Sequence, residues 1–235
     1  MRPLQVVINV LKTLAACSLP PTLACAGAAR PLNATSTPDA SFFHGVDGLG
    51  DVATLTVKRE DVEGATERDG VATMVQVAKE AVAAGMPLTV VTIGPLTNLA
   101  IAMREAPEAF ESSLIRLVVM GGSANGRGNA SRLAEFNVFS DPDAASVVFK
   151  GWRGEVTVVS WDLCVEQPLP WGVWERAVRG RGEVSATHNL SDPRAARRGA
   201  VSPFVNTASP LCEHRQPPLL THVCGTGVSF SVADW

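Results

Sequence analysis

The sequence predicts an α/β fold with a mostly parallel β-sheet flanked by helices. Three apolar runs rich in β-branched residues lead to this prediction, because continuous apolar strands are typical of parallel sheets. These runs are residues 87–93, 114–122 and 155–163. Segments with helical features lie between them, and strands that alternate with helices form βαβ units. We therefore expect helices on both faces of the sheet and ligands beyond the carboxyl ends of its strands.

The composition fits a globular protein with a sizeable core. The chain has 235 residues, of which 46% are apolar and 18% are charged. One α/β domain of ordinary size fits this length. The net charge of −3 argues against a nucleic-acid partner, which would favour a basic surface.

The elements of the first half follow from periodicity and from Gly and Pro. Residues 4–16 place apolar side chains at helical spacing, and "PPTLACAG" (20–27) resembles a short strand after a Pro break. Residues 30–55 are rich in loop-forming residues. Residues 70–84 predict a helix that Gly85 stops.

In the second half, each helix begins near a Pro. Residues 94–106 predict a helix with Pro95 in its first turn. Asp141 is a plausible N-cap for a helix over residues 142–152, with Pro142 at the first position. After about residue 165 the periodicity weakens. We therefore expect a partial α/β domain over residues 1–165 and a poorly defined C-terminal segment over residues 166–235.

The cysteines and the N-terminus bear on localisation. Five Cys at irregular spacing, with no CxxC pair, favour reduced thiols in a cytoplasmic protein. The first 28 residues imitate a secretory signal, which leaves a secreted protein as the alternative. Asn9 and Lys12 interrupt that apolar run. No run approaches the roughly 18 apolar residues of a membrane span, so we expect no membrane partner.

A polar cluster follows the second predicted strand. Asn129, Glu135 and Asn137 offer one carboxylate and two amides, which suit a polyhydroxylated ligand such as a sugar. The alternative is that these side chains cap turns. His44, in a Gly-rich loop beside two Phe, is the best titratable candidate or else a structural histidine. Asp47 and Asp51 match no calcium loop.

Six motifs together resemble the inosine-uridine-preferring nucleoside hydrolase family, the ribonucleoside hydrolases. They occur in the family's order and at its spacing, over about residues 4–165. The motifs are "AGAARPL" (26–32), "FHGVDGLGD" (43–51), "GPLTNLAIA" (94–102), "MGGS" with "GRGNAS" (120–131), "AEFNVFSDPDAA" (134–145) and "VTVVSWDL" (156–163).

The resemblance implies hydrolysis of the N-glycosidic bond of purine or pyrimidine ribonucleosides to base and ribose. In the family, Asp carboxylates hold a Ca²⁺ that binds the ribose diol and the attacking water, and the proteins are commonly homodimers or homotetramers. The partner is then a ribonucleoside or ribose. By resemblance, the residues that match the ribose-hydroxyl binders are Asn129, Glu135 and Asn137. Phe136 matches an aromatic at the sugar, His44 a histidine near the nucleobase, and Ile93 a backbone carbonyl ligand of Ca²⁺.

The departures from the family pattern are as informative as the matches. The family's first strand ends in a DxDxGxDD motif that supplies the general base and most Ca²⁺ ligands, and this sequence has no such run. A His-Asp pair near the family's C-terminus is also absent, because "HNLSDP" (188–193) lacks the adjacency. No catalytic residue is identifiable, and we expect a missing first strand and no bound Ca²⁺. Two hypotheses stay open: a nucleoside hydrolase, or an inactive fragment or pseudoenzyme that retains part of a ribose site.

Overall fold

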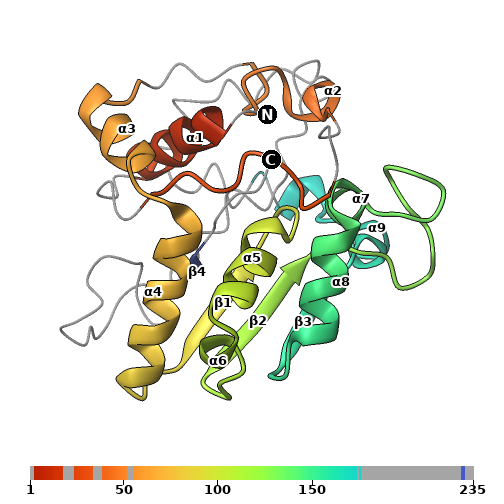
Figure 1. Ribbon diagram of the computed structural model, residues 1–235. Helices are drawn as coiled ribbons and strands as arrows, with labels where there is room; N and C mark the ends of the chain where they lie inside the picture. Colours follow the sequence, from red (N-terminus) through yellow and green to blue (C-terminus); the bar gives the residue numbers. More distant parts are fainter. Residues whose placement is uncertain are drawn as a thin grey trace.

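The three predicted strands lie side by side in a parallel sheet whose order is β3–β2–β1–β4 (Figure 1). The computed structural model describes residues 3–17, 24–33, 39–51, 56–173, 175 and 229–230. The strands are β1 (Leu88–Thr92), β2 (Ile115–Met120), β3 (Val156–Val159) and β4 (Ser229–Phe230). We expected the family's first strand to be missing, without assigning its place in the sheet. In the described residues the short strand β4 pairs with β1 through Thr89 and Val90.

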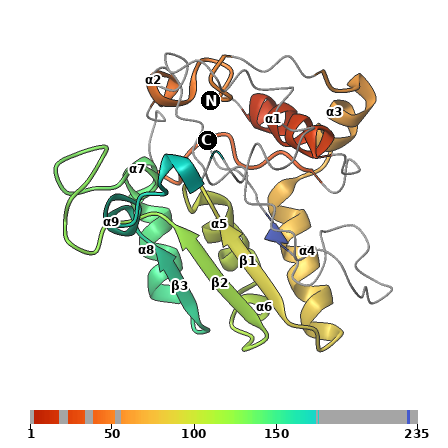
Figure 2. The same cartoon turned by 180° about the vertical axis from the view of Figure 1, so that it is seen from behind.

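The helices form a layer on the sheet and a second group above its carboxyl end. Figure 1 shows α4, α5, α6 and α8 in front of the strands, and Figure 2 shows the strands from behind. In the described part of the chain these helices cover one face, whereas the sequence predicted helices on both. The helices are α1 (Pro3–Ala16), α2 (Ser41–His44), α3 (Arg59–Thr66), α4 (Gly70–Ala83), α5 (Thr97–Glu105), α6 (Pro107–Phe110), α7 (Phe136–Ser140), α8 (Pro142–Gly151) and α9 (Trp161–Glu166).

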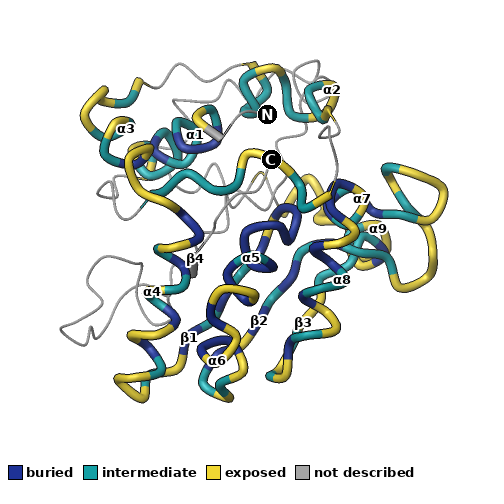
Figure 3. Tube along the Cα trace, in the orientation of Figure 1, coloured by how far each residue is buried: buried dark blue, intermediate teal, exposed yellow. Residues whose placement is uncertain are grey.

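The core fills the space between the sheet and the helix layer (Figure 3). Alternate residues of β1 and β2 point into it, and α4 adds a stripe at helical spacing. Its fully buried side chains include Phe110, Leu99, Ile115, Leu117 and Val90. A smaller cluster of Val7, Leu11 and Ala65 joins α1 to α3. None of the helices within the described ranges has the length and apolar character needed to cross a membrane.

Local signals placed most helix starts correctly. Asp141 caps α8 by accepting the N–H of Ala144 (3.0 Å), and Pro142 is the first helical residue, as the sequence predicted. The helix predicted over residues 94–106 begins only at Thr97, so Pro95 lies before it.

Two strand predictions need correction. Within residues 20–27, the described part contributes only an isolated bridge between Ala26 and Asp69 instead of a strand. The strand predicted to run to residue 163 ends at Val159, because Ser160 caps α9 by accepting the N–H of Leu163.

The segment 24–33 connects the upper helices to the sheet layer. The N–H of Ala28 donates to Oδ1 of Asn98 (2.7 Å), and the N–H of Leu32 donates to Oδ2 of Asp141 (2.9 Å). Asn98 and Asp141 are almost completely buried. These two side chains therefore hold the segment 24–33 in place at the carboxyl ends of the strands.

Candidate functional site

The polar cluster lies where β2 ends, on the side of the sheet at which parallel strands expose their carboxyl ends (Figure 1). After Met120 the chain passes through Gly121 and Gly122 into a loop that returns to α7. The loop places Asn129, Glu135 and Asn137 in one hydrogen-bonded network with Phe136.

Glu135 holds the end of β2 against the start of α7. Its residue is only 5% exposed, and its carboxylate accepts three backbone N–H groups. These belong to Asn137 (2.9 Å) and Val138 (3.2 Å) in α7, and to Gly122 (2.9 Å) after β2. The carboxylate is thus the N-cap of α7 and also a tertiary link.

The Gly-Gly pair makes room for this arrangement. A Cβ at Gly121 would lie 3.1 Å from Oε2 of Glu135 and 3.4 Å from Cβ of Asn137. Gly122 has a φ of 74°, a conformation that favours glycine.

Asn137 uses its Nδ2 to donate to the carbonyl of Met120 (3.0 Å). Within the described residues no donor reaches its Oδ1.

Asn129 lies on the exposed loop and bonds to the first residue of α7. Its Oδ1 accepts the N–H of Phe136 (2.7 Å), and its side-chain N–H groups make no bond within the described ranges. Gly128 lets the loop close, because a Cβ there would collide with the carbonyl oxygens of Ser131 and Ala134. Asn129 therefore offers donors and Asn137 an acceptor, around the N-terminus of α7.

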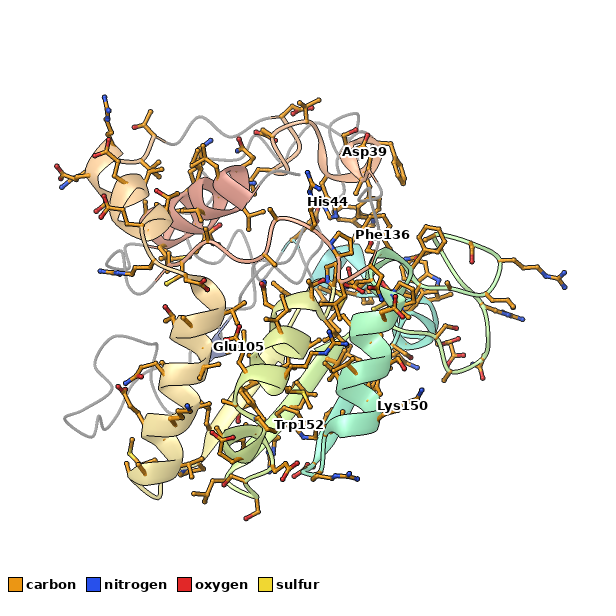
Figure 4. All side chains as sticks on the ribbon, in the orientation of Figure 1. Asp39, His44, Glu105, Phe136, Lys150 and Trp152 are labelled. Atoms are coloured by element: carbon orange, nitrogen blue, oxygen red, sulfur yellow. The ribbon has the colours of Figure 1, made fainter. Side chains whose placement is uncertain are left out.

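The loop of His44 lies above the carboxyl ends of the strands. Figure 4 shows His44 and Phe136 at this end of the molecule, with Trp152 and Lys150 farther down. His44 is half-buried, and this burial lowers its pKa below the ordinary value of 6.5. Its ring makes an edge contact with Phe43, at 4.8 Å between centroids. Nδ2 of Asn9 in α1 donates to the carbonyl of Asp47 (2.8 Å) and so anchors the same loop.

The described residues do not fit a Ca²⁺ site. Ile93 follows β1 and is 40% exposed, but a backbone carbonyl supplies one of the six to eight oxygens that Ca²⁺ requires. Among the described residues, no three His, Cys, Asp or Glu side chains come together around a possible metal position. Asp47 and Asp51 instead accept backbone N–H groups of their own loop.

Sequence reasoning did not foresee the tertiary bonds of two carboxylates near the site. Asp162 accepts N–H groups from the loop after Gly122, and Asp141 bonds to Thr97 and Leu32 in addition to its cap. Asp162 lies at the carboxyl end of the strand predicted over residues 155–163, and this position was the available signal. The partners of Asp141 lie 44 and 109 residues away in the sequence, so no local pattern could have shown them.

The molecule is thus an α/β protein with a parallel sheet and a polar network beyond the carboxyl ends of its strands, the position at which such sheets bind ligands. Residues 2–214 match the family model described as inosine-uridine preferring nucleoside hydrolase. The chain belongs to this family, as the six motifs predicted.

Relatives and solved structures agree with this assignment. The chain is 39% identical over 124 residues to the non-specific ribonucleoside hydrolase RihC of Escherichia coli O127:H6, which covers 53% of this chain and 38% of that protein. An inosine-guanosine nucleoside hydrolase has a TM-score of 0.65 at 29% identity, covering 76% of this chain and 54% of that one. A purine-preferring ribonucleoside hydrolase from Gardnerella vaginalis gives 0.67 at 25% identity, covering 86% and 62%. The chain thus spans less than two thirds of each of these proteins.

Proposed function

We propose that the network at the end of β2 binds the ribose of a ribonucleoside, and that the reaction it serves is hydrolysis of the N-glycosidic bond to free base and ribose. Family membership supports this proposal. The observation that carries it is the bonding pattern of Asn129, Glu135 and Asn137, which leaves hydrogen-bonding groups available around the start of α7.

Each group in the network has a distinct part in holding ribose. The side-chain N–H groups of Asn129 donate to one hydroxyl, and Oδ1 of Asn137 accepts from another. Glu135 already accepts three backbone N–H groups, so it fixes the network and supplies negative charge beside the sugar. Phe136, half-buried between them, covers an apolar face of the ring.

His44 belongs to the nucleobase side of the proposed site. Because burial lowers its pKa, the imidazole is neutral at pH 7 and can donate one hydrogen bond and accept another. Either bond would orient a purine or pyrimidine without the cost of burying a charge.

A second candidate is ribonucleoside binding without hydrolysis. The observation that favours it is the donor set: the described residues gather no group of carboxylates for Ca²⁺. They also present no carboxylate at the site that is available as a general base, because Glu135 is engaged with backbone N–H groups.

Base release and ligand binding together test both candidates. The purified chain is incubated with inosine or uridine, with Ca²⁺ or with a chelator, and the base is quantified by chromatography while affinity is measured by calorimetry. Binding with Ca²⁺-dependent release of base supports the hydrolase, and binding alone supports the second candidate. Absence of binding contradicts both. Asn137→Ala should abolish binding, whereas Asn33→Ala, at an exposed residue bonded to Asp143, should not.

The redox state of the cysteines bears on the cellular compartment of the protein. Within the described part of the chain Cys17, Cys25 and Cys164 form no disulfide. Reduced thiols fit a cytoplasmic protein, and we propose that compartment. Thiol titration of the protein purified without reductant tests this point, because a secreted form would carry oxidised cysteines.

A further inference from the structure

Asp162 lies beside the proposed site but takes no part in the ribose contacts described above. It is in the first turn of α9, and the residue is 8% exposed. Its Oδ2 accepts the N–H of Ala124 (2.6 Å), while Oδ1 accepts the hydroxyl of Ser123 (3.3 Å) and, more distantly, the N–H of Asn125 (3.4 Å). A carboxylate on one element thus bonds to three consecutive residues of another.

These bonds continue along the loop towards Asn129. Oγ of Ser123 accepts the N–H of Arg127 (2.9 Å), which is two residues before Asn129. At the base of the loop, the N–H of Trp161 donates to the carbonyl of Gly122 (2.9 Å). The start of α9 therefore holds residues 122–125, the part of the loop that follows β2. Glu135 in turn joins Gly122 to the start of α7.

The charge state of Asp162 is consistent with this role. Burial alone would raise its pKa, but the hydrogen bonds from Ala124, Asn125 and Ser123 outweigh that effect and hold the pKa below its usual range. The side chain is thus an anion at neutral pH, and charge-assisted hydrogen bonds are the stronger kind. Capping of α9 does not explain its placement, because Ser160 already caps that helix.

We propose that Asp162 is a positioning residue that sets the affinity for ribose by fixing the loop that carries Asn129. This proposal rests on the proposed function, since it assigns Asn129 to the sugar. Asp162 acts on the ligand through Ser123, Ala124 and the loop, and makes no contact with the ligand itself.

The test is a double-mutant cycle with D-ribose as the probe, measured by calorimetry on the full chain. Asp162→Asn should weaken ribose binding about tenfold, the size of coupling found within one hydrogen-bond network. Added to Asn129→Ala, the same change should weaken binding little further. Asp69→Asn, which alters a capping carboxylate of α4 and touches neither α9 nor the loop, is the control and should leave affinity unchanged.

A second variant and a ligand-independent measurement test separately whether Asp162 holds the loop. Ser123→Ala removes one of the partners of Asp162 and should act in the same direction with a smaller effect. In Asp162→Asn, amide hydrogen exchange should accelerate at Ala124 and Asn125 but not at Gly122, which Glu135 holds.

The outcomes separate this proposal from the proposed function. Full additivity of Asp162→Asn and Asn129→Ala, or unchanged affinity in Asp162→Asn, overturns the positioning role while ribose binding stands. Absence of ribose and inosine binding by the wild-type chain overturns the proposed function, and this inference with it.

Discussion

Replacement of Asp141 by Ala tests how the site region is held to the rest of the molecule. Asp141 is 1% exposed and accepts three hydrogen bonds. They come from the hydroxyl of Thr97 (2.6 Å), the N–H of Leu32 (2.9 Å) and the N–H of Ala144 (3.0 Å). The side chain thereby joins α5, α8 and the segment 24–33.

The expected loss of stability follows from these partners. The N-cap bond to Ala144 alone contributes about 1 kcal/mol. The two tertiary bonds, each to a carboxylate in a buried setting, contribute about 1.5 kcal/mol or more apiece. Asp141→Ala should therefore lower the free energy of unfolding by about 4 kcal/mol, a large part of the roughly 5–15 kcal/mol typical of a domain.

Urea unfolding followed by tryptophan fluorescence measures this loss, with Asp69→Ala as the matched control. Asp69 is also an Asp N-cap, accepting the N–H groups of Val71 and Ala72, but it is exposed. Its replacement should cost about 1 kcal/mol. Equal losses in the two variants would refute the claim that Asp141 stabilises through tertiary bonds.

Three further predictions concern the site and its loops. Glu135→Gln should destabilise the protein by about 2 kcal/mol, because an N–H2 replaces one acceptor oxygen; an unchanged urea midpoint would contradict this. Gly121→Ala should cost about 1–3 kcal/mol through contact with Glu135, whereas Gly64→Ala, which meets open space within α3, should be neutral or stabilising. Because burial lowers the pKa of His44, the unfolded chain binds more protons just below pH 6.5. Stability should therefore fall as pH decreases from 7.5 to 5, and less so in His44→Gln; identical pH profiles would exclude that origin.

Local patterns were sufficient to predict most of the sheet and the main helices. β1 and β2 were visible as continuous β-branched runs, and the Asp141-Pro142 pair marked the start of α8. The boundary between β3 and α9 was missed because "VVSWDL" stays largely apolar across it, and only the Ser160 cap separates the two. The strand β4 was not predicted, because two residues carry no periodicity.

The polar cluster was recognised from residue types, but the hydrogen-bonding role of each side chain was not. Sequence reasoning left two interpretations for Glu135, a turn cap and a ligand for hydroxyls. The structure shows that its carboxylate caps α7 and reaches Gly122, 13 residues away, a contact that depends on how the loop folds back. The assignment of Asn129, Phe136, Asn137 and His44 to a ribonucleoside stays a prediction.

Nitrogen-edited NMR of the side-chain amides, during titration with inosine, tests the central claim most directly. Because Asn129 and Asn137 hold groups available to a ligand, their side-chain N–H2 signals should shift and saturate together. The N–H2 of Gln76, bonded to Glu80 on the exposed side of α4, is the internal control and should not move. Absence of any shift at Asn129 and Asn137, with inosine bound or not, would contradict the claim that the end of β2 holds the ribose.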